Sequence, residues 1–186
     1  MTALPERAYL TPEEYLDGET HSDIKHEYHA GEIFAMAGAT DAHVTISGNA
    51  FALLLSHLQG TGCRVYISDM KVRIERRERF FYPNVMVTCD ARDRDTDLYK
   101  QFPKLIIEVL SDSTEAYDRG DKFADYQTLE SLEEYVLINP KRSRIECFRR
   151  GEAGVWVLHT YVEGQFELAS VGLVGAIADL YEYVEI

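Results

Sequence analysis

The chain has 186 residues, of which 46% are hydrophobic and 27% are charged, and no Pro-, Gly- or Ser-rich linker interrupts it. This composition excludes a fibrous repeat and intrinsic disorder, and we expect a single domain over residues 1–186. The 32 acidic and 19 basic residues give a formal net charge of -13. Such a charge repels polyanions at long range, so any nucleic acid must be held by local contacts.

The first third of the chain predicts two helices separated by a strand. Thr11-Pro12-Glu13-Glu14 is typical of a helix start, and a turn at Ala30-Gly31 precedes a strand over 32–36. Thr40 or Asp41 then caps a long helix that ends before Gly60. We expect its buried face to carry the apolar residues at roughly helical spacing, which are Val44, Phe51, Leu54, Leu55 and Leu58.

The rest of the chain is richer in strands. Segments 63–67, 70–75 and 80–88 suggest an antiparallel meander. A nearly continuous apolar run over 104–110 predicts a central strand, which is followed by a helix from Asp112 or Ser113 to about Leu129 and a strand over 134–138. This strand, helix, strand order implies a parallel pair. Short strands and an apolar tail over 171–183 would complete the sheet and cover its edge.

No apolar run reaches the roughly 18 to 20 residues that a membrane helix needs. The N-terminal region is polar where the apolar core of a secretory signal would lie, with Glu6, Arg7, Glu13 and Glu14. We therefore predict a cytoplasmic protein with no membrane partner.

The three cysteines are Cys63, Cys89 and Cys147, which are widely spaced and form no CxxC pair. This pattern favours reduced structural thiols over disulfides or a zinc site.

Glu108 interrupts the apolar central strand. Burying an ionised carboxylate costs several kcal/mol unless a cation compensates it, so Glu108 needs a divalent cation, the Lys122 ammonium, or both. Asp118, Lys122 and Tyr126 recur at i,i+4 spacing and would line one stripe of the following helix. A lysine there could orient a water or stabilise a pentavalent phosphate beside a metal held by acidic oxygens.

Several short segments occur in an order and spacing that resemble the Uma-type restriction-endonuclease family, a branch of the PD-(D/E)XK nuclease superfamily. The segments are Lys25-His26-Glu27-Tyr28 with Gly31-Glu32, Ala42-His43, Tyr82-Pro83-Asn84-Val85, Ile107-Glu108-Val109-Leu110-Ser111 with Ser113-Thr114-Glu115, 118–122, Tyr126 and Glu134-Tyr135. The resemblance covers most of the chain and implies a restriction-endonuclease-like α/β (α+β) fold, in which helices flank a mixed central sheet.

The resemblance also implies the site residues. Glu27, Asn84 and Glu108 would hold Mg²⁺ or Mn²⁺, and Glu27, Glu108 and Lys122 would be the catalytic residues. Leu110 stands two residues after Glu108, so the lysine role moves to Lys122 on the following helix. His43, Lys71 and Arg73 are possible phosphate contacts.

Asn84 departs from the family pattern, which usually has Pro-Asp at this point. An amide oxygen can coordinate a hard cation but brings no negative charge. Asp90 lies six residues further on, roughly 20 Å along a regular strand, and is therefore too distant to replace the missing carboxylate. Asp69 lies in a turn, and only tertiary structure could bring it near Glu108.

The activity that the resemblance implies is hydrolysis of DNA phosphodiester bonds by a magnesium-dependent endonuclease, acting as a homodimer because cutting two strands calls for two sites. Two alternatives stay open. One is a catalytically silent nuclease fold kept for nucleic-acid or protein interaction, which Asn84 and the acidic charge favour. The other is a nuclease for small or RNA substrates.

For two further groups of residues, the sequence pattern favours a structural role. The basic cluster of Lys71, Arg73, Arg76, Arg77 and Arg79 alternates with Glu75 and Glu78, and the pattern favours a solvated hairpin tip over a phosphate-binding surface. The tyrosines Tyr28, Tyr82, Tyr126 and Tyr135 are predicted to pack in the interior with hydrogen-bonded hydroxyls.

Overall fold

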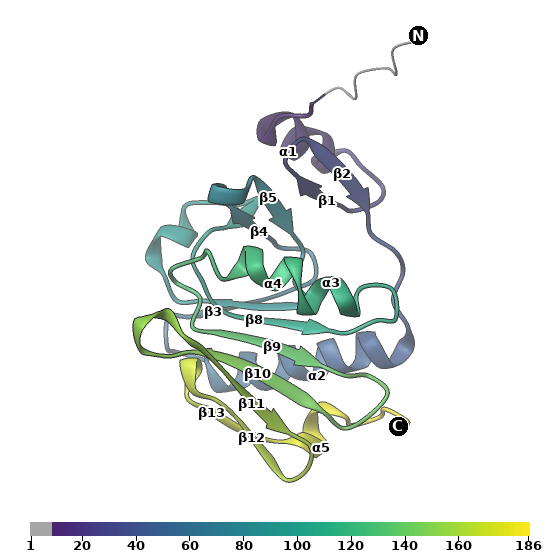
Figure 1. Ribbon diagram of the computed structural model, residues 1–186, viewed down its shortest axis with the longest axis vertical. Coiled ribbons are helices and arrows are strands. Elements are labelled where there is room, and N and C mark those ends of the chain that lie inside the picture. Colours follow the sequence, from purple (N-terminus) through teal and green to yellow (C-terminus); the bar gives the residue numbers. More distant parts are fainter. Residues whose placement is uncertain (1–8) are drawn as a thin grey trace.

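The computed structural model describes residues 9–186, which leaves Glu6 and Arg7 outside the described residues. Its largest element is a mixed six-stranded sheet in the order β11-β10-β9-β8-β6-β3, with helices on both faces (Figure 1). The predicted fold class is confirmed. The strands are β3 (Arg64–Ile67), β6 (Val85–Thr88), β8 (Pro103–Val109), β9 (Glu134–Ile138), β10 (Ile145–Arg150) and β11 (Trp156–Tyr161).

Strand β8 is the central strand that the apolar run predicts, and it contributes to a hydrophobic core on each side. Leu105, Ile107 and Val109 belong to the core shared with the long helix α2, whereas Ile106 belongs to the core shared with α3 and α4. Successive side chains on a strand point to opposite faces, so Glu108 points to the same side as Ile106. The site therefore lies on the α3 and α4 side of the sheet.

Strands β8 and β9 are parallel, as predicted, but the connection between them contains two short helices, α3 (Glu115–Arg119) and α4 (Asp121–Tyr126). The expectation of one continuous helix was wrong. Gly120 separates the two helices with φ -110° and ψ -103°, and a Cβ there would lie 3.1 Å from the backbone oxygen of Ala116. Glycine avoids this close approach to the backbone.

Helix α2 (Asp41–His57) covers the other face of the sheet. It begins after Thr40, whose hydroxyl accepts a hydrogen bond from the His43 backbone N–H. Its buried stripe contains Ile46, Ala50 and Leu54. Val44 and Leu55 are exposed, because they lie off this i,i+4 stripe, so the predicted face was wrong at these two positions.

A second sheet of five strands has the order β2-β1-β5-β4-β7. Helix α1 (Pro12–Thr20) packs against it through Tyr15, which joins Tyr28 and Phe80 in a small aromatic core. The strands are β1 (His26–His29), β2 (Glu32–Ala35), β4 (Lys71–Ile74), β5 (Arg79–Phe81) and β7 (Tyr99–Lys100).

The antiparallel meander expected over residues 63–88 does not form. β3 pairs with β6 in the six-stranded sheet, whereas β4 and β5, which lie between them in sequence, pair with each other in the five-stranded sheet. The segment passes from one sheet to the other and back, so neighbours in sequence are not always neighbours in a sheet.

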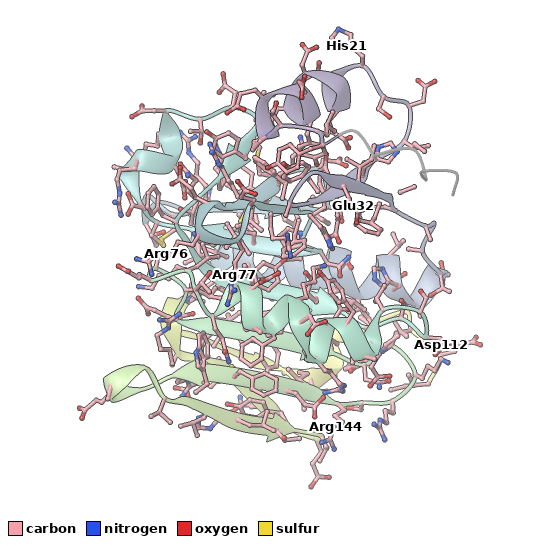
Figure 2. All side chains as sticks on the ribbon, turned by 45° about the horizontal axis from the view of Figure 1, so that its top comes forward. His21, Glu32, Arg76, Arg77, Asp112 and Arg144 are labelled. Carbon is pink, nitrogen blue, oxygen red and sulfur yellow. A yellow bond between two sulfur atoms is a disulfide. The ribbon has the colours of Figure 1, made fainter. Side chains whose placement is uncertain are left out.

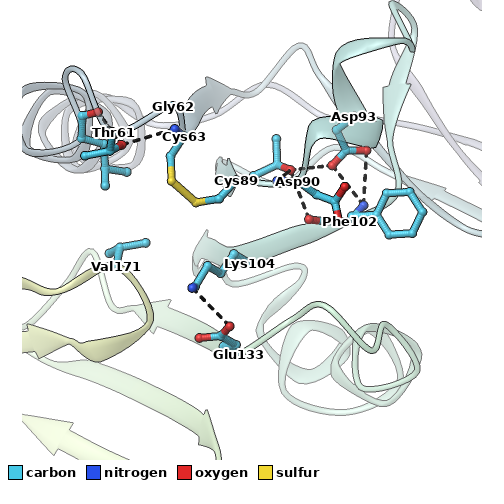
Figure 3. Close-up of a disulfide and its surroundings, with 12 residues drawn as sticks. Thr61, Gly62, Cys63, Cys89, Asp90, Asp93, Phe102, Lys104, Glu133 and Val171 are labelled. Atoms are coloured by element: carbon cyan, nitrogen blue, oxygen red, sulfur yellow. Dashed lines mark hydrogen bonds and ion pairs between the residues drawn. A yellow bond between two sulfur atoms is a disulfide. The ribbon is translucent and has the colours of Figure 1, made fainter.

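The β3–β6 pairing also overturns the prediction of reduced cysteines, because Cys63 and Cys89 form a disulfide (Figure 3). The register pairs Arg64 with Thr88, so the cysteines that flank this pair stand opposite each other, with Cα atoms 4.1 Å apart. Sequence spacing does not reveal this register. Cys147 is a free and buried thiol.

The C-terminal region adds β12 (Gln165–Leu168), β13 (Leu173–Ala176) and α5 (Ile177–Leu180). β10 and β11 complete the large sheet, but β12 and β13 form a separate two-stranded sheet whose apolar residues pack on the α2 side core. Short 3-10 turns occur at Glu75–Arg77, Ala91–Arg94, Glu152–Gly154 and Ala169–Val171. Within residues 9–186, no helix has the length and apolar character needed to cross a membrane.

Candidate active site

Glu108 and Lys122 form a buried ion pair between β8 and α4. The Glu108 residue is 3% exposed, and its Oε1 lies 3.0 Å from Lys122 Nζ. The Tyr126 hydroxyl donates a hydrogen bond to the same oxygen at 3.0 Å, and the Asn84 backbone N–H donates to Oε2 at 3.3 Å. The Glu108 carboxylate therefore has contacts from α4 and from the residue that precedes β6.

Glu27 joins this pair from the other sheet. Its Oε1 lies 3.1 Å from Lys122 Nζ and accepts a hydrogen bond from the Tyr82 backbone N–H at 3.3 Å. The single ammonium of Lys122 thus connects β1 of the five-stranded sheet to β8 of the six-stranded sheet. Residues 81 positions apart in sequence, Glu27 and Glu108, converge as the resemblance implies.

Asp118 is a third acidic member of the site, and it lies on the stripe that the i,i+4 spacing predicts. Its Oδ1 lies 3.6 Å from Lys122 Nζ, and the two side chains are only 4% and 8% exposed. The i,i+4 spacing of Asp118, Lys122 and Tyr126 indicates this burial, since all three side chains point into the protein despite the break at Gly120.

The carboxylate–lysine cluster, defined as Glu27, Glu108, Asp118 and Lys122, has more negative than positive charge. Three ionised carboxylates and one ammonium sum to -2. Burial raises the pKa of Glu108 to about 7, since Lys122 offsets the burial only in part and the other two carboxylates add to it.

Glu27 and Lys122, by contrast, are held in their charged forms. Burial opposes ionisation of Glu27, but Lys122 and several hydrogen bonds outweigh it and hold the pKa of Glu27 below its usual value. Burial likewise disfavours the Lys122 ammonium, yet the three carboxylates hold the pKa of Lys122 above its usual value. The lysine is therefore a cation at neutral pH, and Glu108 is the member of the cluster that takes up a proton near pH 7 when no further cation is present.

Asn84 connects β6 to β8 beside the cluster. The register that pairs Val85 with Ile107 places Asn84 opposite Glu108. Its backbone N–H donates to Glu108, while its side-chain Oδ1 accepts the Val109 backbone N–H at 2.8 Å. One acceptor position of the amide oxygen is thus occupied by the backbone, and a second lone pair is left for another partner.

The donor atoms of the cluster suit a hard divalent cation. Carboxylate and amide oxygens are the ligands that Mg²⁺ prefers, and the excess negative charge favours cation binding. As arranged, Lys122 lies within 3.1 Å of both Glu27 and Glu108, and no group of three His, Cys, Asp or Glu residues within 9–186 is placed to hold a metal. The residues therefore fit the cation in chemistry and charge, and Lys122 would share their oxygens with it.

Comparison with known proteins agrees with this layout. Residues 12–178 match the Uma2 family, whose description is "Putative restriction endonuclease". The chain belongs to the Uma2 family. Two relatives from Synechocystis are the uncharacterized proteins slr1290, 39% identical over 173 residues, and sll1609, 35% identical over 151 residues. They align with 92% and 80% of this chain, and with 91% and 85% of their own lengths.

A solved structure has the same fold as this Uma2 chain. It is the crystal structure of a "putative nuclease belonging to DUF820" from Anabaena variabilis, with a TM-score of 0.73 and 15% sequence identity. The alignment covers 91% of this chain and 98% of that one. At this identity the likeness concerns the fold. Together with the family match, it confirms the predicted family and nuclease-like architecture.

Of the three possible phosphate contacts, only His43 lies beside the cluster. Burial lowers the pKa of His43, while the Val109 backbone carbonyl and the Asp118 carboxylate act to raise it. Lys71 is 7% exposed, with its ammonium 5.1 Å from the centre of the Tyr82 ring. This burial contradicts its expected place in a solvated hairpin tip.

Arg73 borders an open hollow of about 620 Å³ whose lining contains no member of the carboxylate–lysine cluster. Its guanidinium donates to the Tyr99 hydroxyl at 3.1 Å and lies 3.7 Å from Glu75. Arg73 is therefore not brought to the site.

The hairpin between β4 and β5 pairs its remaining basic residues with carboxylates. Arg76 and Arg77 lie at the surface (Figure 2), where Arg76 Nη2 is 2.7 Å from Glu130 and Arg77 Nε is 3.5 Å from Asp125. Arg79 also contacts Asp125, at 3.2 Å. These pairs weaken the local positive field that phosphate binding would need.

Neither candidate replacement for Asn84 reaches the cluster. Asp69 is exposed and pairs with Lys25, and Asp90 pairs with Arg92 at 2.6 Å. The missing carboxylate is therefore not supplied from these two positions.

The four tyrosines pack as predicted, and each hydroxyl has a hydrogen-bond acceptor. The acceptors are the Leu10 carbonyl for Tyr28, Glu19 for Tyr82, Glu108 for Tyr126 and the Asp118 carbonyl for Tyr135. Tyr126 and Tyr135 thereby support two members of the cluster.

Proposed function

We propose that the chain is a metal-dependent endonuclease that hydrolyses DNA phosphodiester bonds. One observation carries this proposal: two buried carboxylates, Glu108 and Asp118, and the partly buried Glu27 surround a single ammonium where the two sheets meet, with net negative charge. Such an arrangement is costly for stability unless a cation compensates it, and strongly perturbed groups of this kind concentrate at functional sites.

Glu27, Asn84 and Glu108 would hold Mg²⁺ or Mn²⁺. When bound, the cation would neutralise charge on the phosphate and lower the pKa of a water ligand. Lys122 keeps its proton, so its role is to donate hydrogen bonds to an anionic phosphate or to a water. The Tyr126 hydroxyl and the Asn84 N–H hold the Glu108 carboxylate in orientation.

The wider assignments follow from the same proposal. A homodimer would provide one site for each strand of a duplex. We also propose a single catalytic domain acting in the cytoplasm, as the sequence predicts, with DNA held locally because the chain carries a net charge of -13.

A second candidate function is a catalytically silent nuclease fold used for interaction. The observation that favours it is the Asn84 side chain, which lacks a charge and whose Oδ1 already accepts the Val109 N–H at 2.8 Å. In that case Asn84 would be a structural link between β6 and β8, and the cluster would persist without turnover.

Plasmid cleavage with Mg²⁺ or Mn²⁺ separates the two candidates. Wild type, Glu108→Ala and Asn84→Asp would be compared, with Glu133→Ala as a control because that glutamate is half exposed and pairs with Lys104 instead. Cleavage by wild type and the control but not by Glu108→Ala supports the endonuclease. Cleavage only after Asn84→Asp identifies a degenerate nuclease, and no cleavage by any variant favours the interaction module.

A further inference from the structure

A row of three aromatic rings lies beside the carboxylate–lysine cluster. The His29 ring is 4.7 Å from the Phe34 ring and 5.9 Å from the Tyr117 ring, measured between centroids. His29 and Tyr117 are nearly parallel, with 20° between their planes. We call Phe34, His29 and Tyr117 the aromatic row. It links β2 and β1 to α3.

The strand register explains why this row borders the cluster. In the β1–β2 hairpin Glu27 is paired with Phe34, and side chains of directly opposed residues project on the same face. His29 lies two residues after Glu27 and therefore shares that face. The β1 face that presents Glu27 to Lys122 thus also presents His29 and, across the strand pair, Phe34.

One end of the aromatic row is open to solvent. Phe34 is 48% exposed, and every residue of β2 is exposed on this edge strand. His29 Nε2 is buried and lies 3.8 Å from Glu27 Oε2, which places the ring beside the cluster. The exposed ring of Phe34 is therefore the part of the row that a ligand can reach, and the His29 ring packs behind it.

The charges nearby favour stacking over extended phosphate contact. Arg119 pairs with Glu115 and Glu146, and Arg79 pairs with Asp125. A duplex gains most of its affinity from many cation–phosphate contacts, which this acidic chain with paired arginines does not offer. Base stacking on aromatic rings contributes affinity for each stacked base in addition to any contact with phosphate, and it needs bases that are not paired in a helix.

We propose that the aromatic row is a stacking platform for an unpaired nucleobase, whose neighbouring phosphate lies at the carboxylate–lysine cluster. This inference rests on the proposed function and names its substrate class: single-stranded or locally unpaired nucleic acid.

Binding is measured by fluorescence anisotropy with a labelled single-stranded DNA of about 10 nucleotides and the matching duplex, with Ca²⁺ in place of Mg²⁺ to compensate the negative charge of the cluster. Phe34→Ala is expected to weaken single-strand binding about fivefold or more, since one stacked base contributes that much or more. Phe34→Trp is expected to keep the affinity, and its indole fluorescence is expected to be quenched by the bound base.

Ile33→Ala is the matched control, because Ile33 is the adjacent exposed residue of β2 and projects to the opposite face. It is expected to bind like wild type, and duplex binding is expected to be weaker and unchanged by Phe34→Ala. The platform would be overturned if wild type and Phe34→Ala bound with equal affinity, or if the two alanine variants lost affinity equally. Tighter binding of the duplex, or no binding at all, would also overturn it.

The same variants distinguish failure of the platform from failure of the proposed function. Single-strand binding that depends on Phe34 without any cleavage in Mg²⁺ or Mn²⁺ would retain the platform and remove the endonuclease. Duplex cleavage that requires Glu108 but is indifferent to Phe34→Ala would retain the endonuclease and remove the platform.

Discussion

Two buried glutamates stand on the adjacent parallel strands β8 and β9, and their surroundings differ. The Glu134 side chain is fully buried and 2.7 Å from Arg149 Nε. It also accepts hydrogen bonds from the Ser170 hydroxyl at 2.6 Å and from the backbone N–H groups of Ser170 and Ala169 at 2.9 and 3.1 Å. Glu108 instead shares one ammonium with two other carboxylates.

The comparison teaches that charge balance, more than burial, separates a structural carboxylate from a candidate catalytic one. Glu134 has its own cation and several donors, and it fastens β9 to the turn before β13. Glu108 is held in place by Tyr126 and Asn84 but is left with uncompensated negative charge. A cation is therefore expected to affect Glu108 and not Glu134.

The largest effect expected concerns catalysis. Glu108→Ala should reduce plasmid cleavage about 10⁴-fold, because removing one member of a catalytic unit disables the whole unit. Glu134→Ala, assayed where it is fully folded, should cleave at the wild-type rate. The measurement is initial rate per folded molecule, and equal losses in the two variants would contradict the division of roles.

The next effect concerns stability. Glu134→Ala should lower the free energy of unfolding by about 3 to 5 kcal/mol, because it leaves Arg149 and the donors of Ser170 and Ala169 without their acceptor. Urea denaturation measures the change. A loss below about 1 kcal/mol would show that water or Glu167, which lies 3.4 Å from Arg149, replaces the lost partner.

The pH dependence of stability should also distinguish the two glutamates. The folded-state pKa of Glu108, about 7, lies above its usual value of 4.5, so the folded protein binds more protons between these values. Glu108 then contributes fully below pH 4.5, and the contribution is lost as pH rises through 7.

As pH rises from 4.5 to 7, the free energy of unfolding of the wild type should fall by on the order of 2 kcal/mol relative to Glu108→Gln, which retains Glu27, Asp118 and Lys122. Urea denaturation at pH 4.5, 6 and 7.5 tests this difference. Parallel pH profiles for the two proteins would refute the assignment.

The smallest effect expected concerns metal affinity, when a negative charge is added at position 84 beside Glu108. In Asn84→Asp one carboxylate oxygen can still accept the Val109 N–H, while the added charge should tighten Mn²⁺ binding about tenfold. Calorimetric titration measures the affinity, and Asn139→Asp serves as the control, because Asn139 directly follows β9 of the same sheet. An unchanged affinity in Asn84→Asp would place the metal away from position 84.

Much of the architecture was predictable because it depends on local pattern. The apolar run around Glu108 predicted a central strand, and the helical segment between residues 110 and 134 predicted the parallel β8–β9 pair. The i,i+4 spacing of Asp118, Lys122 and Tyr126 predicted a shared stripe. These signals are periodicities within one segment, which burial of one face imposes directly on the sequence.

By itself, then, the sequence determined the mixed sheet, the buried glutamate, its lysine partner and the family. Only the tertiary structure decided which distant segments became neighbours: Cys63 opposite Cys89, the Asn84 amide on Val109, Asp118 beneath the surface and Phe34 beside Glu27. The physical reason is register. A shift of one residue between paired strands reverses every side chain, and that alignment is fixed by packing across the whole sheet, not by any single segment.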